Sequence, residues 1–202
     1  AFRQDSSLPL VLPPVNLSVI NNSLKLISLP NCVVSILLTA LAPLTKESKI
    51  KKMFISTYQA ASGAGKVGLK AIDSDQTITP FPHPLKDNLF LHESEKSANG
   101  LCGEEEKIIF ETRKILNQPE LPISVRCVRL PIKRAHSIHA LVTFEQSIHK
   151  FSTILNSSPF ITLHPSPNPL LAEHSPSVFV GDIRKDSTES NTYDFWIVGD
   201  QL

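Results

Sequence analysis

The most apolar segment of this chain opens with Pro30-Asn31-Cys32 and continues as Val33-Val34-Ser35-Ile36-Leu37-Leu38-Thr39-Ala40-Leu41. Asn31 is a favourable N-cap, and Pro30 cannot extend a helix backwards because its nitrogen carries no hydrogen. The pattern therefore predicts a helix that starts at Asn31. We expect it to end near Ala42-Pro43, since the residue before a proline is disfavoured in the helical conformation.

Cys32 would then lie in the first turn of that helix. Backbone N–H groups in a first turn have no intrahelical partners, and the helix dipole adds a positive partial charge. A thiol held there loses its proton more readily, and the thiolate is the form that attacks a carbonyl carbon. The position offers Cys32 as a nucleophile or, alternatively, as a small core residue, because free cysteine is often fully buried.

Length and composition indicate a folded core and exclude several classes of protein. The 202 residues are 41% hydrophobic, which suits one domain or slightly more. A net charge of +1 with both signs interspersed argues against nucleic acid or an acidic membrane as a partner. The longest apolar run, 33–44, is too short to span a bilayer. Three cysteines and the absence of a secretory signal lead us to expect a reducing, cytoplasmic location without disulfides.

The other predicted elements are partly segregated into helices and strands. Prolines within 8–15 indicate an extended edge or connector, a strand is expected at 52–59 with a short helix to about 72, and 74–103 is expected to be mostly loop. The clearest amphipathic helix is 104–117. Strands are expected at 123–130, 137–145, 160–163, 178–185 and 193–198, with one helix at 146–155. This order predicts an α+β fold with a mixed sheet and helices packed on one face.

Several polar residues outside the first helix are candidates for a site. Gln59 ends a strand just before the turn Ser62-Gly63-Ala64-Gly65, where side chains and backbone N–H groups are often exposed to a ligand. Arg129 and His136 flank a basic turn and could supply a carboxylate-binding fork and an acid/base group. The alternative for Gln59 is an ordinary polar residue at a strand end. The alternative for Arg129 and His136 is a basic, solvated turn between two strands.

Glu104 and Lys107 lie three residues apart at the start of the second predicted helix. Residues at this spacing share one face of a helix, so the two side chains can act on one ligand. Taken alone, the pair is better explained as an exposed surface ion pair, because such pairs are common and contribute little to stability.

Taken in order, these segments resemble aspartate-semialdehyde dehydrogenase. The resemblance rests on Pro30-Asn31-Cys32 as a nucleophile motif and on the block 56–65 (STYQAASGAG). It continues through 111–116 (ETRKIL), 129–136 (RLPIKRAH), 178–184 (VFVGDIR) and 196–200 (WIVGD), and is weakest across 74–100 and 146–175. Several such blocks in the same order indicate the family more specifically than any single block does.

The resemblance implies an enzyme that reduces L-aspartyl 4-phosphate with NADPH to L-aspartate 4-semialdehyde and releases phosphate. Such a reaction would serve lysine, threonine, methionine and diaminopimelate biosynthesis. Cys32 would form a thioester, His136 would act as the acid/base and Gln59 would help to position the acyl group. These residue types suit that chemistry, because a thiolate adds to an activated carbonyl and a thioester accepts hydride.

The same resemblance assigns groups to the substrate and to the cofactor NADP(H), and assigns no metal. Asn31, Glu104, Lys107 and Arg129 would form the substrate site, in which Arg129 binds the carboxylate, Glu104 the ammonium group and Lys107 the phosphate. The cofactor would be contacted by three further residues, namely Ser62, Gly63 and Gln201. A homodimer is expected, formed through this domain.

Departures from the family pattern define the expected domain organisation. The chain has no glycine-rich turn between a first strand and helix, so we expect 1–28 to be the tail of an N-terminal NADP-binding Rossmann domain and 29–202 to be the catalytic and dimerisation domain. Such a fragment should bind NADPH weakly and turn over poorly. Ala135 replaces the glycine usual before the histidine, and Val33-Val34 replaces small hydroxyl residues.

Two other functions compete with this interpretation. An N-acetyl-glutamyl-phosphate reductase would use the same thioester chemistry, but its substrate offers no ammonium group to Glu104. A non-catalytic dimerisation module would leave Cys32 with an ordinary thiol pKa near 8.5, whereas a catalytic Cys32 should alkylate well below that pH.

Overall fold

A computed structural model describes residues 2–5, 7–92 and 95–201. The helical elements, including the 3-10 turns labelled η, are η1 (Phe2–Gln4), α1 (Pro13–Asn16), η2 (Leu17–Val19), α2 (Cys32–Glu47), η3 (Ala61–Ala64), α3 (Gly65–Ala71), α4 (Gly103–Leu116), α5 (Phe151–Asn156) and α6 (Pro169–Ala172). The strands are β1 (Ile50–Gln59), β2 (Phe90–Leu91), β3 (Ile123–Arg129), β4 (His136–Phe144), β5 (Ile161–Leu163), β6 (Val178–Lys185) and β7 (Thr192–Gly199).

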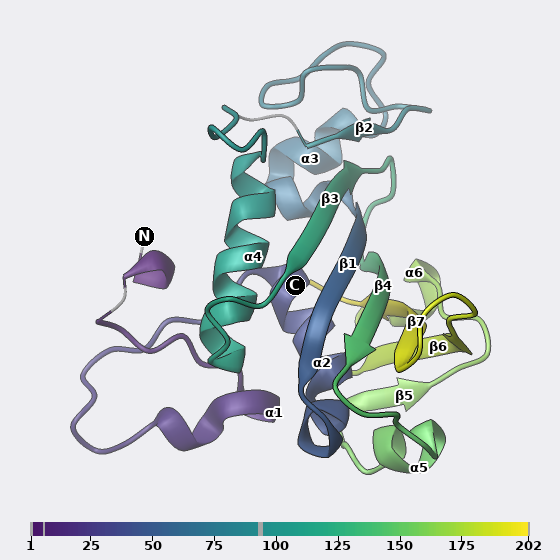
Figure 1. Ribbon diagram of the computed structural model, residues 1–202. Helices are drawn as coiled ribbons and strands as arrows, with labels where there is room; N and C mark the ends of the chain where they lie inside the picture. Colours follow the sequence, from purple (N-terminus) through teal and green to yellow (C-terminus); the bar gives the residue numbers. More distant parts are fainter. Residues whose placement is uncertain (1, 6, 93–94, 202) are drawn as a thin grey trace.

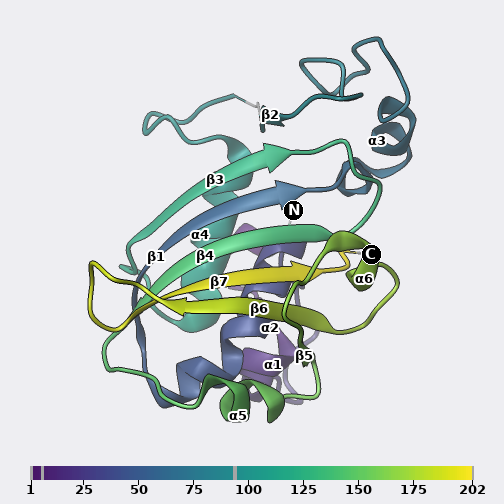
Figure 2. The ribbon, with the colours of Figure 1, turned by 90° about the vertical axis from the view of Figure 1, so that its right-hand side faces the viewer.

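The strands form one mixed sheet of seven strands in the order β2-β3-β1-β4-β7-β6-β5. β1 pairs in parallel with β3, and β5 pairs in parallel with β6, while the other pairs are antiparallel. β1, β3 and β7 therefore point in the same direction, and Figure 2 shows their arrowheads at one end of the sheet, beside α3 and the C-terminus.

The main core lies between the sheet and the helices α2, α4 and α5 (Figures 1 and 2). α2 is apolar over most of its circumference because α1, α4 and α5 flank it while the sheet covers its inner side. The α+β prediction with helices on one face is thus confirmed. On the opposite face, the short α6 region packs over the sheet, where Ala172 meets Phe179 and Val198.

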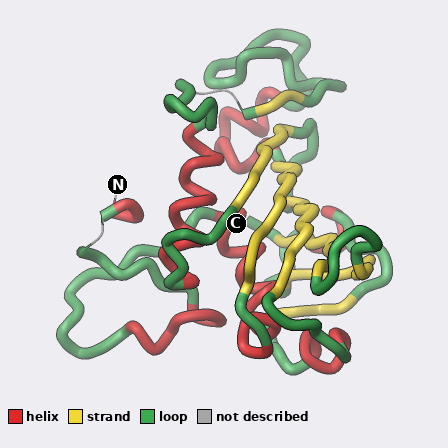
Figure 3. The backbone as a smooth tube through the Cα atoms, in the orientation of Figure 1, coloured by secondary structure: helices red, strands yellow, loops and turns green. Residues whose placement is uncertain are grey.

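Two helix boundaries differ from the sequence predictions. α2 continues through Pro43 to Glu47, because the proline removes only one backbone hydrogen bond while the residues around it, Ala42 to Leu44, remain buried. α5 begins only at Phe151: the Ile148 backbone N–H donates to the Tyr193 hydroxyl, and Lys150 adopts a left-handed conformation. The loop predicted at 74–103 is confirmed for the described residues apart from β2 and Gly103, which begins α4, while residues 93 and 94 lie outside the described ranges. Figure 3 shows irregular chain between α3 and α4.

Within 8–15, the predicted extended connector is found up to Leu12, but the prediction is wrong for Pro13–Asn16, which form the short helix α1 because proline is tolerated at the start of a helix. Leu10 pairs with Ser28 in an isolated bridge, and Leu10, Val11 and Leu12 are buried against the core. Beyond this anchor, large apolar side chains are exposed: Leu17, Val19, Ile20, Leu26, Ile27 and Leu29. Within the described ranges, no helix has the length and apolarity needed to cross a membrane.

Candidate active site

The ends of three strands bring the predicted residues to one edge of the sheet. Gln59 and Arg129 are the last residues of β1 and β3 and are register partners. His136 begins β4 and pairs with Gly199, the last residue of β7. Because β4 runs antiparallel to β1 and β7, its first residue meets their last ones. Residues separated by many positions in sequence therefore meet through strand register.

The start of α2 lies at the same edge. A Cβ on Gly199 would come within 2.9 Å of Ile36, so the missing side chain lets the first turn of α2 approach the end of β7. Asn31 is the N-cap, as predicted, and its Oδ1 accepts a hydrogen bond of 2.8 Å from the Val33 backbone N–H. Cys32 is the first helical residue, and it is partly buried.

The start of α4 faces Asn31. The Asn31 amide nitrogen donates to Glu104 Oε1 at 2.8 Å, and Lys107 Nζ lies 3.7 Å from Glu104 Oε2. The Glu104 side chain is only 16% exposed, whereas that of Lys107 is 48% exposed. The simple surface ion pair therefore does not describe this arrangement, because Glu104 points inwards to the residue beside Cys32 and only Lys107 extends into solvent.

Electrostatics at Cys32 contradict the expected activation by the helix N-terminus. Burial, reinforced by the negative charge of Glu104, raises the pKa of Cys32 to about 11. The Val33 and Cys32 backbone N–H groups and the positive charge of Arg129 lower this pKa, but by less. The prediction of a lowered thiol pKa is wrong for this arrangement, because desolvation outweighs the helix terminus.

Arg129 is the cation shared by this cluster. Its Nη1 donates to the Ala60 carbonyl, and its guanidinium lies 5.6 Å from the centre of the Phe81 ring. Its charge lowers the pKa of Cys32 and of His136, while the burial of Arg129 lowers its own pKa against the opposing effect of Glu104. A buried guanidinium with further N–H groups is well suited to bind a carboxylate.

His136 is completely buried, and its protonation is set by the fold. Burial first, and Arg129 second, lower its pKa to about 3, so the imidazole is neutral near pH 7. Its Nδ1 accepts a hydrogen bond of 3.0 Å from the Ala60 backbone N–H, which assigns the proton of the neutral ring to Nε2. Among the described residues, Nε2 has no hydrogen-bond partner. His136 is therefore a proton donor at Nε2.

Ala135, which precedes this histidine, adopts a left-handed backbone with φ of +66° and is buried. Glycine is favoured in this region because it has no Cβ. The substitution noted in the sequence therefore falls on a position where the backbone itself favours glycine.

The predicted cofactor residues lie beside His136. The Gln201 amide nitrogen donates to the Ser62 hydroxyl, and Gln201 Oε1 is buried without a partner in the part of the chain that is described. A Cβ on Gly63 would come within 3.3 Å of Arg129 Nη1 and His136 Cε1. Because Gly63 has no side chain, the turn packs directly against both of these groups.

Gln59 is positioned differently from its prediction. It is only 2% exposed, and its amide nitrogen donates to the Thr57 hydroxyl at 3.1 Å. The expectation that the strand end exposes this side chain is wrong, because the side chain turns back along β1 to Thr57 and is buried there.

Comparison with known proteins agrees with this geometry. Residues 41–202 match the model of the semialdehyde dehydrogenase dimerisation domain. The chain belongs to the semialdehyde dehydrogenase family.

The resemblance to aspartate-semialdehyde dehydrogenases is confirmed by relatives that match along the whole chain. Enzymes of this name from Prochlorococcus marinus and Bacillus subtilis are 37% and 34% identical to it. The chain spans 64% and 66% of their lengths. The solved aspartate semialdehyde dehydrogenase II from Vibrio cholerae, complexed with ASA, superposes with a TM-score of 0.93 at 28% identity, over 98% of this chain and 64% of that one.

Two further residues of this semialdehyde dehydrogenase domain contact the cluster and had no predicted role. Glu111 accepts a hydrogen bond from the Asn31 backbone N–H at 2.5 Å. Its signal in the sequence is a carboxylate on the apolar stripe of α4, between Ile108 and Ile115. His92 follows β2, and burial and Arg129 lower its pKa to about 4. As a polar loop residue, it carries no comparable sequence signal.

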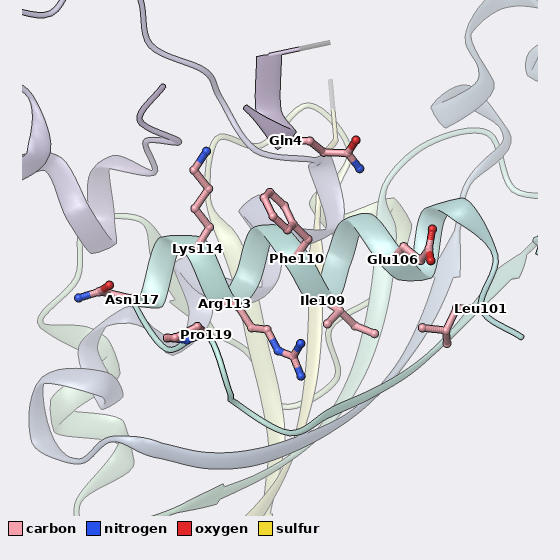
Figure 4. A pocket seen from close by; sticks show the side chains of 9 residues that line it. All are labelled: Gln4, Leu101, Glu106, Ile109, Phe110, Arg113, Lys114, Asn117 and Pro119. Carbon is pink, nitrogen blue, oxygen red and sulfur yellow. The ribbon is translucent and has the colours of Figure 1, made fainter. Parts of the chain in front are cut away.

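A separate pocket of about 720 Å³ lies along another side of α4 in this semialdehyde dehydrogenase domain. Figure 4 shows Phe110, Ile109 and Lys114 around it, with Gln4 of η1 opposite. Residues 106, 110, 113 and 117 share this side of the helix, whereas Glu104 and Glu111, two turns apart, share the side facing Asn31. The pocket is therefore distinct from the cluster around Cys32.

Proposed function

We propose that this chain is the catalytic and dimerisation part of an NADPH-dependent aspartate-semialdehyde dehydrogenase. It would reduce L-aspartyl 4-phosphate to L-aspartate 4-semialdehyde through a thioester on Cys32, in amino-acid biosynthesis. The observation that carries the proposal is the convergence of a thiol, a partly buried carboxylate and a buried guanidinium at Cys32, Glu104 and Arg129, with the carboxylate bonded to Asn31 beside the thiol. Family membership supports the same reaction.

Substrate binding would use the charges in this cluster. Arg129 spends one N–H on Ala60 and retains others for the substrate carboxylate. Glu104 would accept the substrate ammonium group, and the exposed Lys107 would meet the phosphate. Asn31, whose amide already contacts Glu104, would line the same pocket.

Thioester formation would be coupled to that binding. Glu104 is one of the two groups that raise the pKa of Cys32, so an ammonium group bound to Glu104 offsets part of this effect and favours the thiolate. The sulfur then attacks the acyl carbon, the bond from carbon to the phosphate oxygen breaks, and phosphate leaves with the electron pair. The thiol proton is lost to the departing phosphate or to solvent.

His136 would act as the general acid in the reduction step. Its Nε2–H is available to protonate the oxygen that becomes negatively charged when the thioester carbonyl is reduced, and the same nitrogen takes the proton back when the aldehyde is released. Gln59, held by Thr57, would help to fix the acyl group.

The cofactor-side residues present in this chain fit NADP(H). Ser62, Gly63 and Gln201 combine a turn that packs directly against His136 with an orphaned amide oxygen, Gln201 Oε1, that a nicotinamide carboxamide could satisfy. NADPH, when bound there, would supply hydride. We expect the 202-residue chain to bind it weakly, since the family's glycine-rich phosphate-binding turn is not in this sequence.

The domain organisation follows from the same proposal. Residues 1–28 would belong to the cofactor domain, and their exposed apolar side chains, such as Leu17, Ile20 and Leu26, offer a surface for it. Residues 29–202 would form the catalytic domain and pair as a homodimer, for which the sheet face bearing Phe54, Tyr58 and Trp196 is available. Such an enzyme would work in the cytoplasm.

The direct test is to trap the acyl-enzyme. The chain is mixed with L-aspartyl 4-phosphate without NADPH, quenched with acid and analysed by peptide mass spectrometry. The proposal expects an aspartyl adduct on Cys32 and none on Cys102 or Cys127, which are buried. An unmodified Cys32, or an adduct that forms equally on the other cysteines, would contradict it.

A further inference from the structure

Glu111 is a completely buried carboxylate in the middle of α4. Its neighbours on the same stripe, Ile108 and Ile115, belong to the hydrophobic core. Burying a carboxylate costs free energy unless it is hydrogen-bonded, and a leucine at this position would continue the apolar stripe. The carboxylate therefore requires an explanation beyond packing.

The hydrogen-bond partner of Glu111 is Asn31, the N-cap residue of α2. Glu111 Oε2 accepts a hydrogen bond of 2.5 Å from the backbone N–H of Asn31, 80 residues away in sequence. Oε1 has no hydrogen-bond partner in the described ranges, so the contact with Asn31 is what satisfies this side chain. A carboxylate that accepts from a backbone N–H forms a charge-assisted bond, which is stronger than a neutral one.

Asn31 is consequently held through its backbone N–H and through both polar atoms of its side chain. Its backbone N–H is bound by Glu111, its amide nitrogen by Glu104 and its Oδ1 by the Val33 N–H. The first two contacts come from α4 and the third from α2, so Asn31 links the two helices. Cys32 is the next residue, and its backbone cannot shift without moving Asn31.

We propose that Glu111 is a positioning residue that fixes Asn31, and through it sets the place of the Cys32 sulfur relative to Glu104 and Arg129. The description of Cys32 as the nucleophile rests on the proposed function, whereas the link from Glu111 to Asn31 and Cys32 does not. The role of Glu111 depends on the length of its side chain and on where its oxygen points, because that oxygen contacts the backbone of Asn31.

Two substitutions separate the effect of the length of the Glu111 side chain from the effect of its charge. Glu111→Gln keeps the length and a carbonyl oxygen that can accept from Asn31, whereas Glu111→Asp keeps the charge but shortens the side chain by one methylene. We expect the Asp variant to form the Cys32 thioester about tenfold more slowly at saturating L-aspartyl 4-phosphate, because the sulfur is misplaced. The same variant should be alkylated by iodoacetamide about tenfold faster, since release of Asn31 exposes the thiol. The Gln variant should stay within about threefold of the parent in both rates.

Glu105→Asp is the matched control. Glu105 is also a buried carboxylate of α4, and its Oε2 accepts from a backbone N–H, that of Cys102, at 3.0 Å. This variant should lose comparable thermal stability and leave both Cys32 rates unchanged. The inference would be overturned if Glu111→Asp and the parent had equal rates of Cys32 thioester formation and alkylation. Equal changes of these rates in Glu105→Asp and Glu111→Asp would also overturn it. So would a Glu111→Gln variant whose rates change as much as those of Glu111→Asp. If the parent forms no thioester, the proposed function fails and the alkylation rates alone decide the role of Glu111.

Discussion

Cys32 and His136 lie at the same edge of the sheet, yet the protein controls them in different ways. Cys32 is partly buried between a carboxylate and a guanidinium, so its pKa depends on charges that a ligand can neutralise. His136 is completely buried, and its tautomer is fixed by a backbone N–H. If Cys32 and His136 have the proposed roles, thiolate formation would respond to substrate, whereas proton donation would be built into the fold.

The largest effect is expected from replacing His136, whose tautomer is fixed by a backbone N–H. His136→Gln replaces the imidazole with an amide, which can donate a hydrogen bond but cannot give up a proton as an acid, so we expect aldehyde formation to fall by about 10²–10⁴-fold while the Cys32 thioester still forms. Single-turnover mass spectrometry at high NADPH concentration should show the thioester accumulating. A variant that consumes its thioester at the parent rate would show that His136 is not the acid.

Glu104→Gln tests whether the pKa of Cys32 depends on the charge of Glu104. Removing the negative charge lowers the pKa of Cys32, so alkylation at pH 8–9 should accelerate several-fold. Thioester formation from L-aspartyl 4-phosphate should nevertheless fall by about tenfold or more, because the ammonium group loses its partner.

N-acetyl-L-glutamyl 5-phosphate provides the control for this variant, since it carries no ammonium group. Its use should not fall in Glu104→Gln, and it should rise with the alkylation rate, because the same change lowers the pKa of Cys32. Equal losses with both substrates would contradict the role of Glu104, and faster use of the acetylated substrate by the parent would favour the reductase alternative.

Acid should destabilise the protein through the two buried histidines. The pKa values of His136 and His92 are lowered to about 3 and about 4, below the unfolded value near 6.5. Between these values the unfolded chain binds more protons than the folded one, so stability is complete above pH 6.5 and is lost as the pH falls towards 4. Thermal unfolding should show this slope, and His136→Gln should flatten it. An unchanged slope in that variant would mean that His136 is charged in the fold.

The smallest effects are expected at Ala135. Ala135→Gly relieves the left-handed backbone but removes a buried methyl group and adds unfolded-state entropy, so the free energy of unfolding should change by less than about 1 kcal/mol. Ala135→Val should destabilise by more than about 2 kcal/mol, because a β-branched residue is strained at positive φ. Chemical denaturation measures both. A Val variant as stable as the parent would show that this turn does not hold the backbone before His136.

Local patterns predicted the elements well where periodicity and capping act alone. Asn31 capped its helix as expected, and α4 matched within a residue at each end. The errors arose where tertiary contacts outweigh local preference, as at Pro43, which the core retains inside α2. The family resemblance gathered the site residues, but neither the raised pKa of Cys32 nor the burial of Gln59 could be read from sequence, because both depend on desolvation by distant segments.

The central claim is that Cys32 takes the acyl group from an acyl phosphate. The most direct measurement is the release of inorganic phosphate from L-aspartyl 4-phosphate without NADPH, compared between the parent chain and Cys32→Ser. The account predicts a burst that approaches one phosphate per chain in the parent and no burst in the variant. A burst of equal size in Cys32→Ser, or none in the folded parent, would contradict it.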